Sequence, residues 1–145
     1  MRIAAICLAM SFRVATAFAQ VLDEPTTDAR LASVRQAVLA NAPDKHGLIG
    51  EVSSGVATWL SSPRMDLSID PSVRNTVIAT CDLRCTSVSF WVIDNQGDSI
   101  LEGGNGSALA RGVIPTGRAR KVIIRLSVKC LADPCAWAAG VFAPD

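Results

Sequence analysis

Residues 121–130 have the sequence KVIIRLSVKC, and this stretch decides the fold. Four apolar side chains share one face of it when the chain is extended: Val122, Ile124, Leu126 and Val128. Alternation with period two is the pattern of a β-strand that buries one side and exposes the other. The opposite face carries three cations: Lys121, Arg125 and Lys129. The stretch therefore predicts a half-buried strand of an antiparallel sheet.

Shorter stretches with related patterns lie on both sides of this strand. They predict further strands at about 64–70, 77–81, 87–94, 100–101, 109–114 and 136–142. Turn-forming residues separate several of them, as in Asn95-Gln96-Gly97-Asp98 and Pro115-Thr116-Gly117. Between these strands there is no helical crossover, the usual connection in parallel pairing. The chain is therefore predicted to be mainly β, an antiparallel β-sandwich of about seven strands.

The N-terminal part of the chain has a different pattern. Leu31, Val34 and Val38 are spaced for one face of a helix over 28–40, with Thr27 as a candidate N-cap. Apolar residues between 47 and 60 also keep a helical spacing, although the glycines and serines among them lower the helix propensity. We expect one or two α-helices in an N-terminal segment, residues 20–62, followed by the sandwich at 63–145.

The beginning of the chain has the layout of a secretory signal peptide. Arg2 gives it a positive start, residues 3–10 an apolar run, and Ala17-Phe18-Ala19 a small-residue cleavage site. The apolar run is too short to span a bilayer, which takes about 20 residues. We expect residues 1–19 to be removed, no transmembrane segment to remain, and the mature protein to be periplasmic or secreted.

Cleavage would leave an even set of cysteines. Cys7 is lost with the signal peptide, and four remain: Cys81, Cys85, Cys130 and Cys135. Four cysteines in an exported chain indicate two disulfides. The short spacings favour the local pairs, 81 with 85 and 130 with 135, while pairing across strands stays open. Zinc is the alternative, but structural zinc sites prefer C-x2-C pairs, so we expect neither a metal nor a cofactor.

The second half of the chain resembles a known family. The segment Cys81-Asp82-Leu83-Arg84-Cys85 is followed by a strand that ends in Asp94-Asn95-Gln96-Gly97, and KCLADPCAWAAGVF occupies 129–142. The order of these motifs resembles small exported bacterial proteins related to the prepeptidase C-terminal domain (PPC-like), a jelly-roll-like β-sandwich. The resemblance covers about half of the chain. It implies a jelly-roll-like fold and an exported location more than an activity.

This sequence departs from that group in its acidic residues. Relatives carry acidic groups just after the second cysteine and again after the hairpin. Here the first positions hold residues 86–89, with the sequence TSVS, and the later glycine-rich loop has only Glu102. If relatives bind a cation there, this chain lacks most of the ligands. The stretch 94–98 also misses the spacing of an EF-hand calcium loop, so we interpret it as a hairpin turn.

Composition and motifs argue against several function classes. Loss of Arg2 and Arg13 reduces the 14 basic residues to 12, against 13 acidic ones, so nucleic-acid binding is not expected. His46 is the one histidine and lies in a turn-forming stretch. The sequence lacks the G-x-S-x-G, H-E-x-x-H and P-loop motifs. We expect no enzyme and no catalytic residue, with a hydrolase as the least favoured alternative.

Basic residues gather around one turn and strand and form the candidate binding surface. Its members are Arg118, Arg120, Lys121 and Arg125, together with Trp91. The alternative is that these cations are the ordinary solvent face of an amphipathic strand. Trp91 lies on the opposite face from Phe90, so it faces either solvent or a second layer such as the N-terminal helix.

These observations favour an exported non-catalytic binding or accessory module of the cell envelope. Its expected partner is an envelope glycan or another exported protein. A structural or chaperone-like protein-interaction factor is the alternative.

Overall fold

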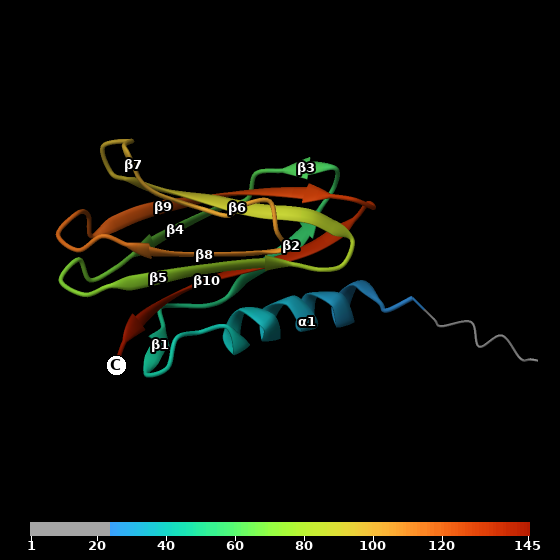
Figure 1. The fold of residues 1–145 in the computed structure, drawn as a ribbon, viewed down its shortest axis with the longest axis horizontal. Helices are drawn as coiled ribbons and strands as arrows, with labels where there is room; N and C mark the ends of the chain where they lie inside the picture. The colour runs from blue at the N-terminus through green and yellow to red at the C-terminus, as the bar shows by residue number, and fades with distance from the viewer. Residues whose placement is uncertain (1–23) are drawn as a thin grey trace, which may run out of the picture.

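The computed structural model describes residues 24–145, and the predicted signal peptide lies outside them. One helix precedes two antiparallel five-stranded sheets that face each other (Figure 1). The elements are α1 (Thr27–Ala40), β1 (His46–Leu48), β2 (Ser53–Ala57), β3 (Leu60–Ser61), β4 (Arg64–Ser68), β5 (Asn75–Cys81), β6 (Cys85–Asp94), β7 (Ser99–Gly103), β8 (Leu109–Ile114), β9 (Lys121–Cys130) and β10 (Cys135–Pro144). The mainly β, sandwich-like fold with a helix near the N-terminus is therefore confirmed.

The two sheets have distinct membership. Sheet A has the strand order β1-β10-β5-β8, and β2 also pairs with β10. Sheet B has the order β3-β9-β6-β7, and β4 also pairs with β9. Consecutive strands therefore change sheet at two turns that matter below: β5 to β6, and β9 to β10. Within residues 24–145, all the paired strands run antiparallel.

The strand predicted at 121–129 is β9, in the centre of sheet B. Its four apolar residues are buried, at 2 % exposure or less, and pack on Phe90 of β6 and on the inner face of sheet A. Its three cations are exposed on the outer face. One face of the strand therefore belongs to the core and the other to solvent.

Helix α1 packs on the outer face of sheet A. Its N-cap is Thr26, whose hydroxyl accepts a hydrogen bond from the Ala29 N–H at 3.2 Å, one residue before the predicted cap. Val34 and Val38 are buried in a second apolar cluster with Ile78 of β5 and Phe142 of β10. The helix therefore covers one sheet and leaves the outer face of sheet B open to solvent.

The second predicted helix, over 47–60, is wrong. Most of this stretch forms β1, β2 and the beginning of β3. Gly55 lies across from Trp137 of β10, and a β-carbon there would come within 3.2 Å of the indole ring. Pairing with β10 outweighs a helical spacing that three glycines and two serines had already weakened. These three strands account for the difference between the ten strands found and the seven expected.

Candidate functional site

Two disulfides fasten the sheets together at one end of the sandwich. Cys81 of β5 is bonded to Cys85 of β6, and Cys130 of β9 is bonded to Cys135 of β10. These are the two local pairs that the spacing favours. Because each bond joins a strand of one sheet to a strand of the other, each one spans a turn between the layers. We call this end of the molecule the disulfide end.

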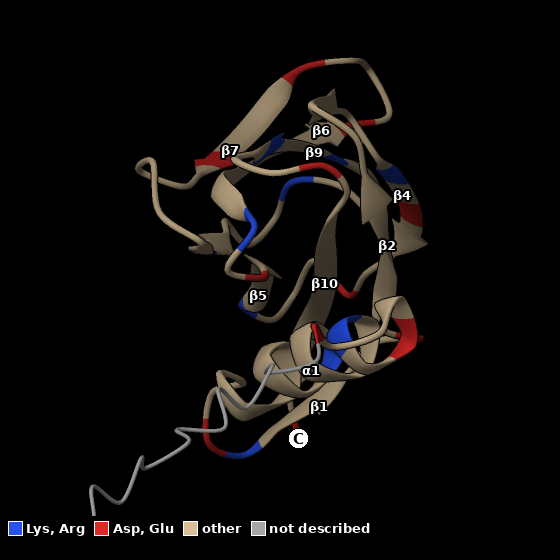
Figure 2. Ribbon diagram, turned by 90° about the vertical axis from the view of Figure 1, so that its right-hand side faces the viewer, with Lys and Arg blue, Asp and Glu red and all other residues tan. Residues whose placement is uncertain are grey.

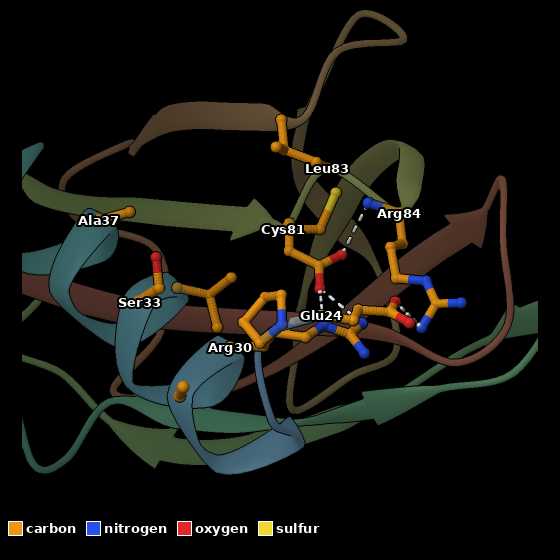
Figure 3. Close-up of a pocket in the computed structure, with 11 residues that line it drawn as sticks. Glu24, Arg30, Ser33, Ala37, Cys81, Leu83 and Arg84 are labelled. Atoms are coloured by element: carbon orange, nitrogen blue, oxygen red, sulfur yellow. Dashed lines mark hydrogen bonds and ion pairs between the residues drawn. The ribbon is translucent and has the colours of Figure 1, made fainter. Parts of the chain in front are cut away.

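Arg30 of α1 ties the helix to both disulfide turns, and Figure 3 shows its side chain beside the first of them, the turn from β5 to β6. Its Nε donates to Asp82 Oδ2 at 2.7 Å, and its Nη2 donates to the Pro134 carbonyl at 2.7 Å. Asp82 belongs to the first turn and Pro134 to the second. The side chains of Arg30 and Asp82 are 8 % and 12 % exposed, so the ion pair is largely desolvated. Arg84, in the first turn, also pairs with Glu24 at 3.0 Å.

A pocket of about 470 Å³ lies between α1 and the turn from β5 to β6. Ala29, Val34 and Ala37 line it from the helix, and Cys81 and Leu83 from the other side. The charged groups at its edge already bind each other, since Asp82 is held by Arg30 and by the Arg84 N–H at 3.1 Å. The pocket is therefore part of the interface along which the helix packs on the rest of the fold.

Sequence reasoning missed Arg30, although a signal was present. Arg30, Val34 and Val38 are spaced by four residues and share one face of the helix. A cation in line with two buried valines needs a buried acceptor, because an unpaired charge is costly in an apolar environment. That spacing could have predicted an acid opposite the first turn of α1.

The outer face of sheet B holds the exposed part of the candidate surface. Trp91 of β6 is the direct cross-strand neighbour of Arg125 of β9 and of Glu102 of β7. Arg125 has Arg64 of β4 on its other side. Directly paired residues point to the same face, so the four side chains form one row across the sheet. Figure 2 shows the basic positions on β9 and β4.

The cations of this face differ in their partners. Arg64 binds Asp66 at 2.7 Å on the same strand, which raises the pKa of Arg64 and lowers that of Asp66, chiefly through their side-chain hydrogen bond. For Lys121, Arg125 and Lys129, by contrast, no ion pair forms within residues 24–145. These three are the charges that a ligand can engage without displacing a partner.

The predicted surface is divided between this face and the neighbouring turn. Trp91, Lys121 and Arg125 lie on strands of sheet B. Arg118 and Arg120 are exposed in the turn from β8 to β9, at the end opposite the disulfides. Arg120 helps to lower the pKa of Asp70, after the larger effect of hydrogen bonds from Ser72.

The three tryptophans lie in separate parts of the structure. Trp91 is 36 % exposed on sheet B and therefore lies away from α1, so the idea that it packs against the helix is wrong. Trp137 is buried, and Trp59 is 78 % exposed at the disulfide end. Trp91 is therefore the tryptophan that can stack against a ligand on the face of sheet B.

The structure gives His46 no catalytic surroundings within residues 24–145. Its Nδ1 lies 2.9 Å from the Asp44 carbonyl oxygen in a surface turn. Asp94 caps its own hairpin by accepting hydrogen bonds from the N–H groups of Gln96 and Asp98, at 2.8 and 2.9 Å. No group of three or more potential metal ligands gathers in this part of the chain. Nor does any helix there have the length and apolar character needed to cross a membrane.

Fold and site together define a small, disulfide-stapled, sandwich-like protein with an open basic sheet face. No protein-family model matches the chain, and no curated protein matches it. Among solved structures, the chain is similar to PliG of Aeromonas hydrophila, a periplasmic inhibitor of g-type lysozyme, with 15% identity over 62% of this chain and 83% of that one. The TM-score is 0.40, which is too low to carry a conclusion about this chain.

Proposed function

We propose that this protein is an exported, non-catalytic binding module that holds an anionic envelope glycan on the outer face of sheet B. The observation that carries the proposal is a set of three cations along β9: Lys121, Arg125 and Lys129. They form no ion pair within residues 24–145, and Arg125 is the cross-strand neighbour of Trp91. Two disulfides are typical of proteins in an oxidising compartment, which supports export.

The spacing of these three cations along β9 suits a repeating polyanion. Successive cations are four residues apart on one strand, a separation of about 13 Å at the rise of a β-strand. Trp91 offers an aromatic surface next to Arg125, and sugar rings bind to such surfaces through their apolar faces. Charge would supply attraction and orientation, and Trp91 would supply contact area.

Binding is proposed rather than catalysis because Lys121, Arg125 and Lys129 can attract an anion, while Glu102 lies at one side of the face and Asp66 is held by Arg64. The jelly-roll-like sandwich of the PPC-like resemblance belongs to the same proposal and rests on the order of the cysteine and turn motifs.

A second candidate is a protein-interaction factor that acts through a sheet edge. Strand β8 ends sheet A, and its Leu109 and Val113 are 40 % and 45 % exposed. An exposed edge with apolar side chains can pair with a strand of another protein. A partner of this kind would bind independently of the cations on β9.

The test is binding of the exported protein to purified lipopolysaccharide and to peptidoglycan over a range of salt concentrations. We expect affinity to fall steeply with salt, and the double variant Lys121→Ala/Arg125→Ala to bind about tenfold more weakly. Trp91→Ala should weaken binding without changing the salt dependence.

The matched control is Arg35→Ala, which removes an exposed cation from α1 on the far side of the molecule. Equal losses in the control and the double variant would indicate a non-specific charge effect. Absence of binding to both preparations at low salt would reject the glycan proposal, and recovery of one protein that depends on β8 would favour the second candidate.

A further inference from the structure

A hollow of about 440 Å³ lies on the outer face of sheet B, at the end where β9 begins. Its volume falls in the range of small-molecule sites, roughly 300–1,000 Å³. The residues that line it include Asp66 and Ser68 of β4, Lys121 and Ile123 of β9, and Asn95 of the turn from β6 to β7. We call these five residues the polar hollow. The proposed function uses only Lys121 among them.

The strand register brings the five residues together. Ser68 pairs with Lys121, and Asp66 pairs with Ile123, across β4 and β9. Directly paired residues point to the same face, and Lys121 is exposed on the outer one. Asn95 comes directly after the last residue of β6, which lies on the other side of β9 and is paired with its beginning. Three segments of the chain therefore contribute polar groups to one place.

The polar hollow offers both donors and acceptors of hydrogen bonds. The Lys121 ammonium donates, the Asp66 carboxylate accepts, and the Ser68 hydroxyl and the Asn95 amide do both. Within residues 24–145, the side chains of Ser68 and Asn95 form no hydrogen bond and Lys121 forms no ion pair. A ligand can bind these three side chains without displacing a partner.

Asp66 is held in place by Arg64. The Arg64 Nε donates to Asp66 Oδ2 at 2.9 Å, and its Nη2 donates to Oδ1 at 2.7 Å. Each carboxylate oxygen has two lone pairs, so each can still accept a hydrogen bond from a ligand. Because the carboxylate is already oriented, binding does not have to order it.

The mixed charges of this region favour a ligand with hydroxyl groups over a bare anion. Lys121 faces Asp66 in the hollow, Arg64 binds that acid, and the adjoining turn carries Asp94 and Asp98. Net charge therefore does not attract an anion into the hollow itself. A sugar hydroxyl both donates and accepts, so it can use the carboxylate as well as the ammonium group. A carboxylate or phosphate ligand only accepts, and Asp66 would repel it.

We infer that the polar hollow binds a hydroxyl-bearing sugar unit of the glycan and so distinguishes a glycan from other polyanions. The inference rests on the proposed function, in which cations along β9 hold the anionic groups. Ile93 is the cross-strand neighbour of Ile123 and connects the hollow with Trp91 on the same face. Lys121 in the hollow is about 13 Å from Arg125 beside Trp91, at the rise of a β-strand, so the expected ligand is a chain of sugar units.

The experiment compares binding of the exported protein to lipopolysaccharide and to peptidoglycan with binding to polyglutamate, a polyanion without sugars. The double variant Ser68→Ala/Asn95→Ala removes two hydrogen-bonding groups and no charge. We expect it to bind the glycan about tenfold more weakly, as the loss of two hydrogen bonds implies, and to bind polyglutamate as the parent does. Its salt dependence should equal that of the parent.

Asn105→Ala is the matched control, because Asn105 is an exposed asparagine in the loop from β7 to β8, outside the hollow. It should leave both affinities unchanged. The Lys121→Ala/Arg125→Ala variant should weaken binding to the glycan and to polyglutamate alike. Circular dichroism and urea denaturation establish that each variant is folded.

The outcomes separate this inference from the proposed function. Equal glycan affinity of the Ser68→Ala/Asn95→Ala variant and the parent would overturn the inference and leave the proposed function in place. A matching loss of polyglutamate binding would also overturn it, because the two side chains would then act on any polyanion. If the parent binds neither glycan preparation, the proposed function is rejected and the inference with it.

Discussion

Arg30 is a cation on the buried side of a helix, and its two acceptors lie on the two disulfide turns. Removing one partner of a buried ion pair leaves the other charge unpaired in an apolar environment, at a cost of about 3 kcal/mol. We therefore expect Arg30→Ala to lower the free energy of unfolding by roughly that amount, measured by urea denaturation.

Arg35→Ala is the control for this prediction, because Arg35 is exposed on the same helix. It should change the free energy of unfolding by less than about 0.5 kcal/mol. Similar effects of the two substitutions on the free energy of unfolding would show that Arg30 is not needed to stabilise the charge of Asp82.

Asp66 offers a residue-scale test of the electrostatics on sheet B. Its hydrogen bond from Arg64 lowers its pKa, so the ionised form is favoured in the folded state. The stabilisation is present above the unfolded value, about 3.9, and is lost as the pH falls through the folded value. In an NMR titration of the carboxyl carbons, Arg64→Ala should raise the pKa of Asp66.

Asp70 is the internal reference in the same titration. Its pKa is lowered mainly by hydrogen bonds from Ser72 and should be the same in both proteins. An unchanged Asp66 in the variant would contradict the observed ion pair.

At the scale of elements, β7 packs closely against Phe90 because it has a glycine, with no side chain, at the point of contact. Gly103 lies opposite Phe90, and a β-carbon there would overlap the fully buried ring. Overpacking a core typically costs 1–3 kcal/mol. We expect Gly103→Ala to destabilise the fold by about 2 kcal/mol in thermal or urea unfolding.

Gly47→Ala is the matched substitution. A β-carbon at Gly47 would meet only the Asp145 side chain, which can move away at the end of the chain. If Gly103→Ala and Gly47→Ala had the same free energy of unfolding, β7 would adjust freely and would not fix the position of Phe90.

The elements predicted best from the sequence are those whose apolar residues recur at a regular spacing. Strand β9 alternates without interruption, and α1 has a capping residue and a buried stripe. The stretch 47–60 was mistaken because short apolar runs fit either period, and pairing with β10 decides between them. Gly103 lies in the glycine-rich stretch that was interpreted as a loop, for a related reason: the Phe90 ring that needs the glycine is distant in sequence.

At the scale of the whole molecule, the disulfides are predicted to stabilise one end of the sandwich. A loop as short as 130–135 contributes about 2 kcal/mol in the chain-entropy model. The double variant Cys130→Ser/Cys135→Ser should lose roughly this much unfolding free energy, and the turn from β9 to β10 should exchange its amide hydrogens faster. Unchanged protection of the Leu131 N–H, which donates to the Arg84 carbonyl, would show that backbone hydrogen bonds alone hold this turn.

The candidate sites depend on contacts between residues far apart in sequence, and for this reason sequence identified only part of them. Cysteine spacing favoured both disulfides, and strand alternation placed Lys121 and Arg125 on the solvent face. The hydrogen bonds of Cys130 to the Trp59 carbonyl and of Leu131 to the Arg84 carbonyl were not visible, because they form only when three turns meet at the disulfide end.

The central claim is that the two sheets are joined at one end by local disulfides in an exported protein. Peptide mapping by mass spectrometry, on protein recovered from the periplasm without reduction, tests it most directly. We predict an N-terminus at Gln20, with Cys81 bonded to Cys85 and Cys130 to Cys135. Reduced thiols, a bound metal, or bonds between the two pairs would contradict the account.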